Sequence, residues 1–274
     1  MSERFAIVPL LREAVVETVL VPRRWLPALA LLLPVLALQL AFPGYLRSRL
    51  SPSLSTVVLG GLAIAWLTQV AGVAAVGWVH RQRQGEAVAP LQLAVVALLA
   101  GTGAFAGLLA GAIPGLWLQA RWAFAPLTRG QASSRAALGE SASRARPHMW
   151  TLAALGVTTL VLSVLGQSMA AGAADALGTI VPAAVVDGRT RFELHYLPHA
   201  ATSILAWWLA ALAMTVQAVG VSRVAVRAGA PVAQPVLLRP HWRPTMRAAA
   251  WASGALVLAL GIAAATFKLQ QHLH

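Results

Sequence analysis

Long apolar runs, separated by short arginine-bearing loops, constrain this chain more than any other feature. About 20 residues of helix cross the hydrocarbon core of a bilayer. Lipid offers the backbone no hydrogen-bonding partner, so apolar runs of this length cross as helices. The pattern predicts an all-α, polytopic transmembrane bundle of about six or seven spans, forming a single membrane domain over residues 1–274. The predicted spans are residues 25–42, 57–79, 91–110, 116–127, 149–170, 200–221 and 248–267.

Composition excludes the main soluble classes. Hydrophobic residues make up 58% of the chain and charged residues 11%, whereas soluble domains carry about 25% charged residues. The mean hydropathy is +0.71. The chain has no cysteine, which excludes disulfides and thiolate metal sites. These features favour an integral membrane protein.

The charge balance is strongly basic, with 21 Lys and Arg against 8 Asp and Glu. The basic residues lie in loops between apolar runs rather than on one continuous face, so we do not expect nucleic-acid binding. The positive-inside rule assigns the loops at residues 80–86, 129–146 and 222–247 to the cytoplasmic side. The N-terminus is then also cytoplasmic.

Residues 89–127 form an apolar region of 39 residues, which is too long for one crossing. Ile113-Pro114-Gly115 is the expected break, because proline removes a helical hydrogen bond and glycine frees the backbone. We expect a hairpin with a full span at 91–110 and a segment at 116–127 that is either a short crossing or re-entrant. Two successive cytoplasmic loops then flank it.

Two further segments complete the predicted topology. Residues 1–24 form a cytoplasmic segment whose apolar spacing predicts an amphipathic helix at residues 5–21, ended by Pro22 and lying along the membrane surface. Residues 171–186 are predicted to form a separate interfacial or re-entrant helix on the outer side.

One stretch is more specific than composition. Gly111 to Leu127 contains the Ile-Pro-Gly break and Arg121, and a basic, serine-rich helix is predicted at residues 134–144 before the next span. This order resembles a group of bacterial multi-span proteins that includes the membrane domain of some glycerophosphoryl diester phosphodiesterases and the YciC-like families. The matching positions are Pro114, Gly115, Arg121, Pro126, Ala137, Leu138, Ser141 and Trp150. The resemblance implies an all-helical, multi-pass protein of the bacterial cytoplasmic (inner) membrane, without catalysis of its own.

Arg121 is the most informative single residue, because an arginine at the centre of a membrane helix costs about 2.5–3.5 kcal/mol. It either anchors a lipid phosphate or the carbonyls of the broken helix, or it lies near a span end and reaches the interface. The candidate ligand- or lipid-binding residues are Arg121, Pro114, Gly115, Ser141, Arg135 and Arg144.

No recognisable catalytic motif is present, and no cofactor is expected. His195 and His199 are spaced to share a helix face, but a third zinc ligand is missing and Pro198 argues against a regular helix, so we expect no metal site.

The expected function is that of a non-catalytic scaffold or accessory protein, whose basic loops contact anionic phospholipid or whose surface binds a partner complex. The alternative is a transporter or lipid flippase that uses the broken helix near Arg121. A third reading, an intramembrane enzyme, would involve residues such as Ser168 and Asp175.

Overall fold

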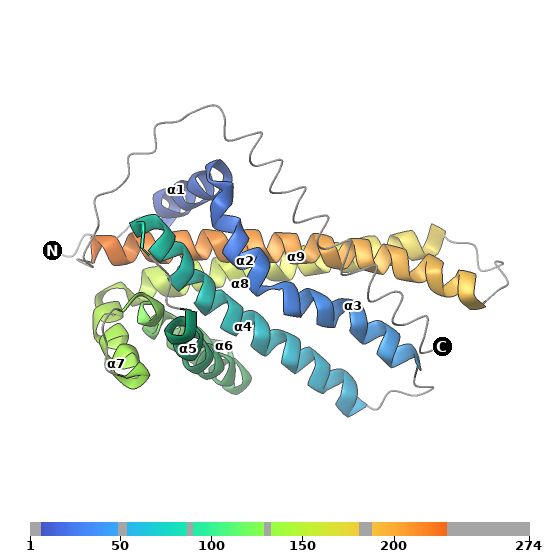
Figure 1. Ribbon diagram of the computed structural model, residues 1–274, viewed down its shortest axis with the longest axis horizontal. Helices are drawn as coiled ribbons and strands as arrows, with labels where there is room; N and C mark the ends of the chain where they lie inside the picture. Colours follow the sequence, from blue (N-terminus) through green and yellow to red (C-terminus); the bar gives the residue numbers. More distant parts are fainter. Residues whose placement is uncertain (1–6, 49–53, 87–89, 129–132, 181–187, 229–274) are drawn as a thin grey trace.

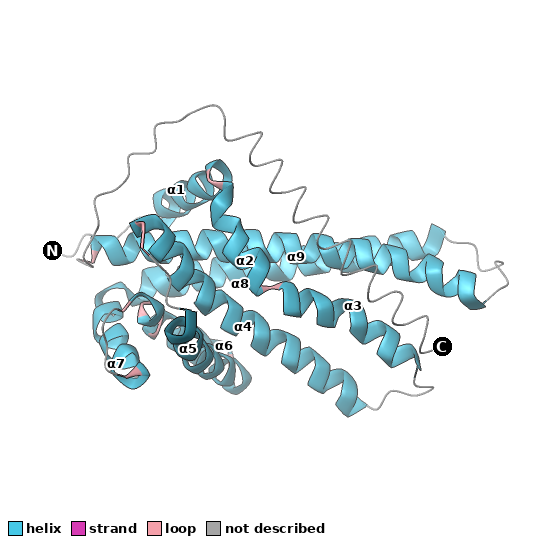
Figure 2. Cartoon of the chain, in the orientation of Figure 1, coloured by secondary structure: helices cyan, strands magenta, loops and turns pink. Residues whose placement is uncertain are grey.

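A computed structural model describes residues 7–48, 54–86, 90–128, 133–180 and 188–228, which form helices and no strand within these ranges (Figure 2). The all-α prediction is confirmed for this part of the chain. Four helical stretches in it are long and apolar enough to cross a membrane. They are Val58–Gln84, Pro90–Ala110, Arg135–Gly166 and Ala200–Arg227. The total of six or seven spans stays a prediction, and the predicted span at 248–267 lies outside the described residues.

The elements follow one another along the chain with short connections (Figure 1). They are α1 (Ile7–Leu20), η1 (Pro22–Arg24), α2 (Trp25–Leu31), α3 (Leu33–Ser48), α4 (Leu54–Gln84), α5 (Pro90–Ala110), α6 (Ala112–Arg121), η2 (Ala125–Leu127), α7 (Ser134–Ala145), η3 (Arg146–His148), α8 (Met149–Ile180) and α9 (Gly188–Arg227).

Helix α9 is the centre of the bundle. It runs beside α8 and also contacts α1, α2, α3 and α4 (Figure 1). Two groups of buried side chains form the core along it. One group, with Leu36 and Trp207, joins α2, α3 and α4 to α9. The other, with Leu10, Phe124 and Val219, joins α1, α4, α6 and α8 to the C-terminal part of α9.

The predicted hairpin is present, but the break lies at a different residue. Helix α5 ends at Ala110 and α6 begins at Ala112, so Gly111, with φ of 145°, makes the turn. Only glycine adopts this backbone conformation readily. The prediction placed the break at Ile113-Pro114-Gly115 and was wrong, because a proline in the first helical turn costs nothing where its N–H would lack a partner anyway.

The segment after the break returns alongside α5. Helix α6 has 10 residues, about 15 Å of helix, so it is too short to cross the hydrocarbon alone. Turns and η2 then place Pro126 beside Gly77 of α4. Leu93, near the start of α5, lies beside the same glycine. The chain therefore returns to the N-terminal end of α5, as expected for a hairpin.

Three other expectations need correction. Helix α8 continues to Ile180, so residues 171–180 are not a separate interfacial helix; this stretch is rich in alanine, which sustains a helix. Helix α9 passes through Pro198 without a break, since a long helix tolerates the loss of one hydrogen bond. The predicted span at 25–42 is interrupted at Leu32, between α2 and α3.

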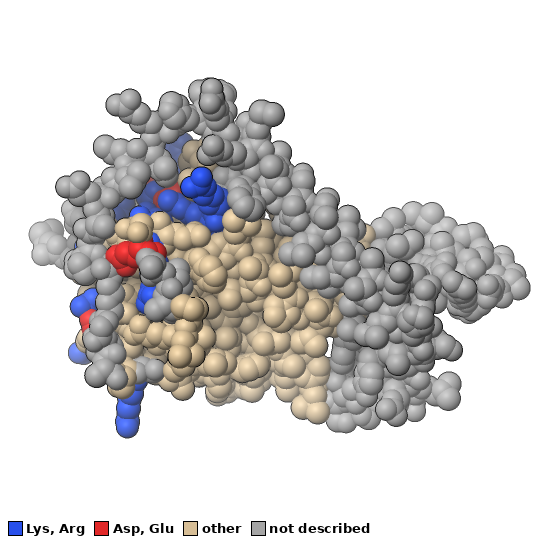
Figure 3. All heavy atoms as spheres, viewed as in Figure 1, with Lys and Arg blue, Asp and Glu red and all other residues tan. Residues whose placement is uncertain are grey.

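The basic residues gather at one end of the bundle. The C-terminal ends of α4 and α9 meet α1 and α7 there, and the charged side chains cluster over these elements (Figure 3). The described surface over the middle of the bundle is uncharged in the same view. The described parts of the loops that the charge pattern assigned to one side therefore lie at the same end of the molecule, which we call the basic end.

Candidate functional site

The residues of the helix break serve to pack the α5–α6 hairpin. Pro114 is exposed and Gly115 is buried. A Cβ atom at Gly115 would come within 2.7 Å of the backbone nitrogen of Leu108, and one at Gly107 would come within 2.9 Å of the Gly115 Cα. The small residues thus allow two helix backbones to approach closely within the monomer.

Arg121 is the last residue of α6, and its side chain is exposed. The guanidinium carbon lies 4.7 Å from the centre of the Trp117 ring, one turn earlier, which is a cation–π distance. This placement fits an arginine at the end of a helix better than one inside the bundle.

Ser141 ties α7 to the end of α6. Its hydroxyl is fully buried, accepts a hydrogen bond from the Phe124 backbone N–H at 3.1 Å and donates one to the Arg121 carbonyl at 3.0 Å. These backbone groups lie where α6 ends, so their own helix does not pair them. Ser141 therefore has a structural role: it joins α7 to the end of α6, and its buried hydroxyl is not accessible to a ligand.

Arg135 and Arg144 lie on the exposed surface of α7. Arg144 pairs with Glu140 one turn earlier at 2.5 Å. Helix α7 confirms the predicted serine-rich helix, and its first turn is capped by the Ser133 hydroxyl, which accepts from the Ala136 N–H at 3.2 Å. The two arginines therefore extend the basic end outward from the bundle.

The six predicted site residues do not form a single site. Arg121, Ser141, Arg135 and Arg144 belong to the junction of α6 and α7. Pro114 and Gly115 lie at the other end of α6, about 10 Å away along the helix axis. The sequence grouped these residues by their order along the chain.

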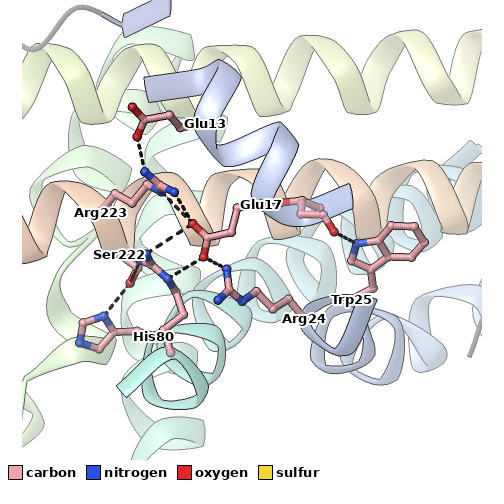
Figure 4. Close-up of polar contacts among 9 residues, drawn as sticks. Glu13, Glu17, Arg24, Trp25, His80, Ser222 and Arg223 are labelled. Atoms are coloured by element: carbon pink, nitrogen blue, oxygen red, sulfur yellow. Dashed lines mark hydrogen bonds and ion pairs between the residues drawn. The ribbon is translucent and has the colours of Figure 1, made fainter. Parts of the chain in front are cut away.

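Sequence reasoning missed a highly connected polar group, a carboxylate–arginine cluster centred on Glu17 (Figure 4). The Glu17 side chain is 9% exposed, and its Oε1 pairs with Arg24 and, at 2.9 Å, with Arg83 Nε. Its Oε2 accepts from Arg223 Nε at 2.8 Å and Nη2 at 2.6 Å. The two-pronged pairing with Arg223 fixes orientation as well as distance.

The cluster is linked to a second buried polar group and to a second carboxylate. Arg83 Nη1 donates to Ser222 Oγ at 2.7 Å, and Ser222 Oγ lies 2.9 Å from His80 Nδ1. Glu13 pairs with Arg223, and Arg227 Nη2 lies 3.6 Å from Glu13 Oε2. The cluster thereby fastens α1 to the ends of α4 and α9.

Positive charge exceeds negative charge in this cluster. Burial, and then the charges of Arg83 and Arg223, lower the pKa of Arg24 from its usual value to about 10. Arg24 remains protonated at neutral pH, so its contact with Glu17 is an ion pair. Glu17 is the carboxylate that pairs with arginines from η1, α4 and α9, and it offsets only part of their charge.

Two signals in the sequence could have revealed the cluster. Glu13 and Glu17 are one helical turn apart, in a chain with only 8 acidic residues. The second signal was hidden, because Arg223 was assigned to a loop whereas α9 continues to Arg227.

Helix α1 packs a mixed apolar and polar face against the bundle. Leu10, Ala14 and Thr18 are buried, and the two glutamates beside this face contact the arginines. Val8 and Val19 are exposed. Apolar side chains on the outer face suit a helix at the boundary between headgroups and hydrocarbon.

A cavity of about 440 Å³ lies inside the bundle, among α4, α5, α6, α8 and α9. Leu116, Gln119 and Trp122 line it from the segment after the break, whereas Arg121 is not among the lining residues. Within the described ranges, no group of three His, Cys, Asp or Glu side chains could hold a metal ion. The side chains of Asp175, His195 and His199 lie outside the described residues.

Comparison with known proteins finds no matching family model, no matching curated protein and no matching solved structure.

Proposed function

We propose that this chain is a non-catalytic integral protein of a bacterial cytoplasmic membrane, which acts as a scaffold or accessory protein. Its basic end faces the cytoplasm and contacts anionic phospholipid headgroups or a partner complex. The single observation that carries this proposal is the segregation of charge. Charged side chains gather over α1 and α7, at one end of a bundle whose described residues include four helices apolar enough to span a membrane (Figure 3). The resemblance to the phosphodiesterase membrane domains and YciC-like families stays a prediction.

The basic end divides into inward and outward arginines. Arg24 and Arg83 point inward and pair with Glu17, so they hold α1 on the bundle. Arg135 and Arg146 have exposed side chains, as does Arg144 beside its partner Glu140. Each basic residue close to an anionic membrane surface contributes about 1 kcal/mol of attraction. The outward arginines are therefore the ones available to lipid headgroups.

Native mass spectrometry of the full chain in mild detergent, with added phosphatidylglycerol, tests the proposal. Reversing both charges on α7, by Arg135→Glu and Arg144→Glu, should reduce the bound phosphatidylglycerol about tenfold or more. The matched control, Arg135→Lys with Arg144→Lys, keeps the charge and should keep the lipid. Equal lipid retention in all three proteins refutes a lipid role of this surface, and a stoichiometric protein partner retained in each of them supports the accessory role instead.

A transporter or lipid flippase is the second candidate. The observation in its favour is that the segment after the helix break lines a cavity, as discontinuous helices do in transporters. A proteoliposome assay of labelled-lipid movement between leaflets tests it, because a scaffold leaves the rate at that of protein-free vesicles.

A further inference from the structure

The cavity inside the bundle is elongated along the helices. Its lining runs from Gly61 to Val76 on α4, 15 residues apart and thus about 22 Å of helix, and includes Gly156 to Val164 on α8. A volume of about 440 Å³ is within the range of small-molecule sites. The shape suits a chain-like molecule that lies parallel to the helices.

Polar but uncharged groups meet in this cavity. The side-chain amides of Gln69, Gln119 and Gln217 come from α4, α6 and α9, and they make no hydrogen bond within the described part of the chain. The hydroxyl of Ser163 on α8 is also unpaired within these ranges. These residues are half-buried and line the cavity; in an apolar cavity a polar group without a partner costs free energy, so an occupant that hydrogen-bonds is favoured there.

Within the described ranges, the lining contains no charged side chain. A charged headgroup would lose its water here without gaining an opposite charge, which is strongly unfavourable. The occupant that fits therefore has a polar group without net charge. Arg121 and the Glu17 cluster do not line the cavity.

The edge of the cavity is exposed on the side of α4 and α8. Gly61 and Ala65 on α4, and Leu160 and Val164 on α8, are both lining and exposed, whereas Thr159 and Met214 form the buried floor. These edge residues are small or apolar and belong to two candidate membrane spans. In a membrane such an opening faces lipid, so an amphiphile can enter sideways.

One glycine is explained by the same site. A Cβ at Gly156 would lie 3.1 Å from the Gln119 Oε1, which is tighter than an ordinary van der Waals contact. Gly156 thus makes room for the Gln119 side chain on the wall opposite α6.

We propose that this cavity binds an uncharged amphiphile, whose hydrocarbon chain lies along α4 and α8 and whose hydroxyl, ester or amide group meets Gln69, Gln119 and Gln217. The site is independent of the proposed scaffold role, because no described residue of the exposed basic surface lines it. It provides hydrogen-bond donors and acceptors for a neutral polar group and an apolar wall for the chain.

Photo-crosslinking of the full chain in lipid nanodiscs tests this. The probes are diacylglycerol and phosphatidylglycerol that carry a diazirine in one acyl chain. The diacylglycerol probe should label the peptides at residues 61–76 and 156–164 more strongly than the phosphatidylglycerol probe does. Gln69→Leu and Gln217→Leu should each reduce this labelling about fivefold, as expected for one lost hydrogen bond. Gln92→Leu, the same change on α5 outside the lining, should leave it unchanged.

A second pair of variants keeps the proposal falsifiable if a glutamine variant fails to fold. Ala65→Phe places a ring at the edge of the cavity and should abolish the labelling, whereas Ala106→Phe, on an exposed part of α5, should not. Equal labelling of the cavity peptides by both probes, labelling no stronger than on the outer face of α5, or labelling that survives Ala65→Phe overturns the proposal. Loss of phosphatidylglycerol labelling in the α7 charge-reversal variant tests lipid binding by the basic surface and leaves the cavity proposal unaffected.

Discussion

Replacing Glu17 with glutamine tests whether the carboxylate–arginine cluster holds the N-terminal helix on the bundle. The substitution keeps the shape of the side chain and removes its charge. Arg24, Arg83 and Arg223 all pair with this carboxylate. The variant leaves Arg24 and Arg83 without their carboxylate partner, whereas Arg223 keeps its pair with Glu13.

The size of the effect follows from the burial of the partners. Removing one partner of a buried ion pair costs about 3–5 kcal/mol. The Arg83 and Arg223 side chains are 19% and 25% exposed, so water screens part of the repulsion, and we expect about 3 kcal/mol. Each kcal/mol shifts the melting temperature of a protein of this size by about 2–4 °C, so Glu17→Gln should lower it by roughly 9 °C.

The chain contains a matched control for the same substitution. Glu140 pairs with Arg144 one turn away on α7, and the Arg144 side chain is 48% exposed. Exposed helical pairs of this kind contribute about 0.3–0.5 kcal/mol, so Glu140→Gln should lower the melting temperature much less than Glu17→Gln does. Thermal unfolding of both variants in mild detergent, followed by the helical circular dichroism signal, gives the comparison. A Glu17→Gln shift no larger than that of Glu140→Gln refutes the reasoning.

Three further predictions concern the α5–α6 hairpin and its contact with α7. Ser141→Ala removes two hydrogen bonds from buried backbone groups and should destabilise the protein by about 1–3 kcal/mol. Ser143→Ala, at an exposed position, is the control. Equal unfolding curves for the two variants would contradict the structural role of Ser141. Gly115→Ala drives a methyl group into the α5 backbone and should cost about 1–3 kcal/mol, whereas Gly139→Ala, with open space around it, should be harmless in the same melting assay. Arg121→Ala should leave labelling of the cavity by the diacylglycerol probe unchanged, because this side chain lies outside the lining; a loss would show that Arg121 reaches the cavity.

Hydropathy and loop charge predicted the larger features of the fold. The span at 91–110 coincides almost completely with α5, because a continuous apolar run has one stable form in lipid. The expected helix at residues 5–21 is α1 at Ile7–Leu20, ended by Pro22. The predicted position of the break was wrong because proline and glycine were read as equal signals, whereas within residues 111–115 only Gly111 adopts a positive φ.

The candidate site was harder to predict, because its parts are distant in sequence and joined only by packing. Glu17 and Arg223 are 206 residues apart, and neither local sequence contains a pattern that predicts the contact between them. The search for chemistry in the spans followed charged residues, since they are the most costly in lipid. Gln69, Gln119 and Gln217 carry no charge and passed unnoticed within apolar runs. All three line one cavity. A neutral amide in a membrane helix, like a charge, needs a hydrogen-bonding partner, so its position in the sequence is also a signal of a polar site.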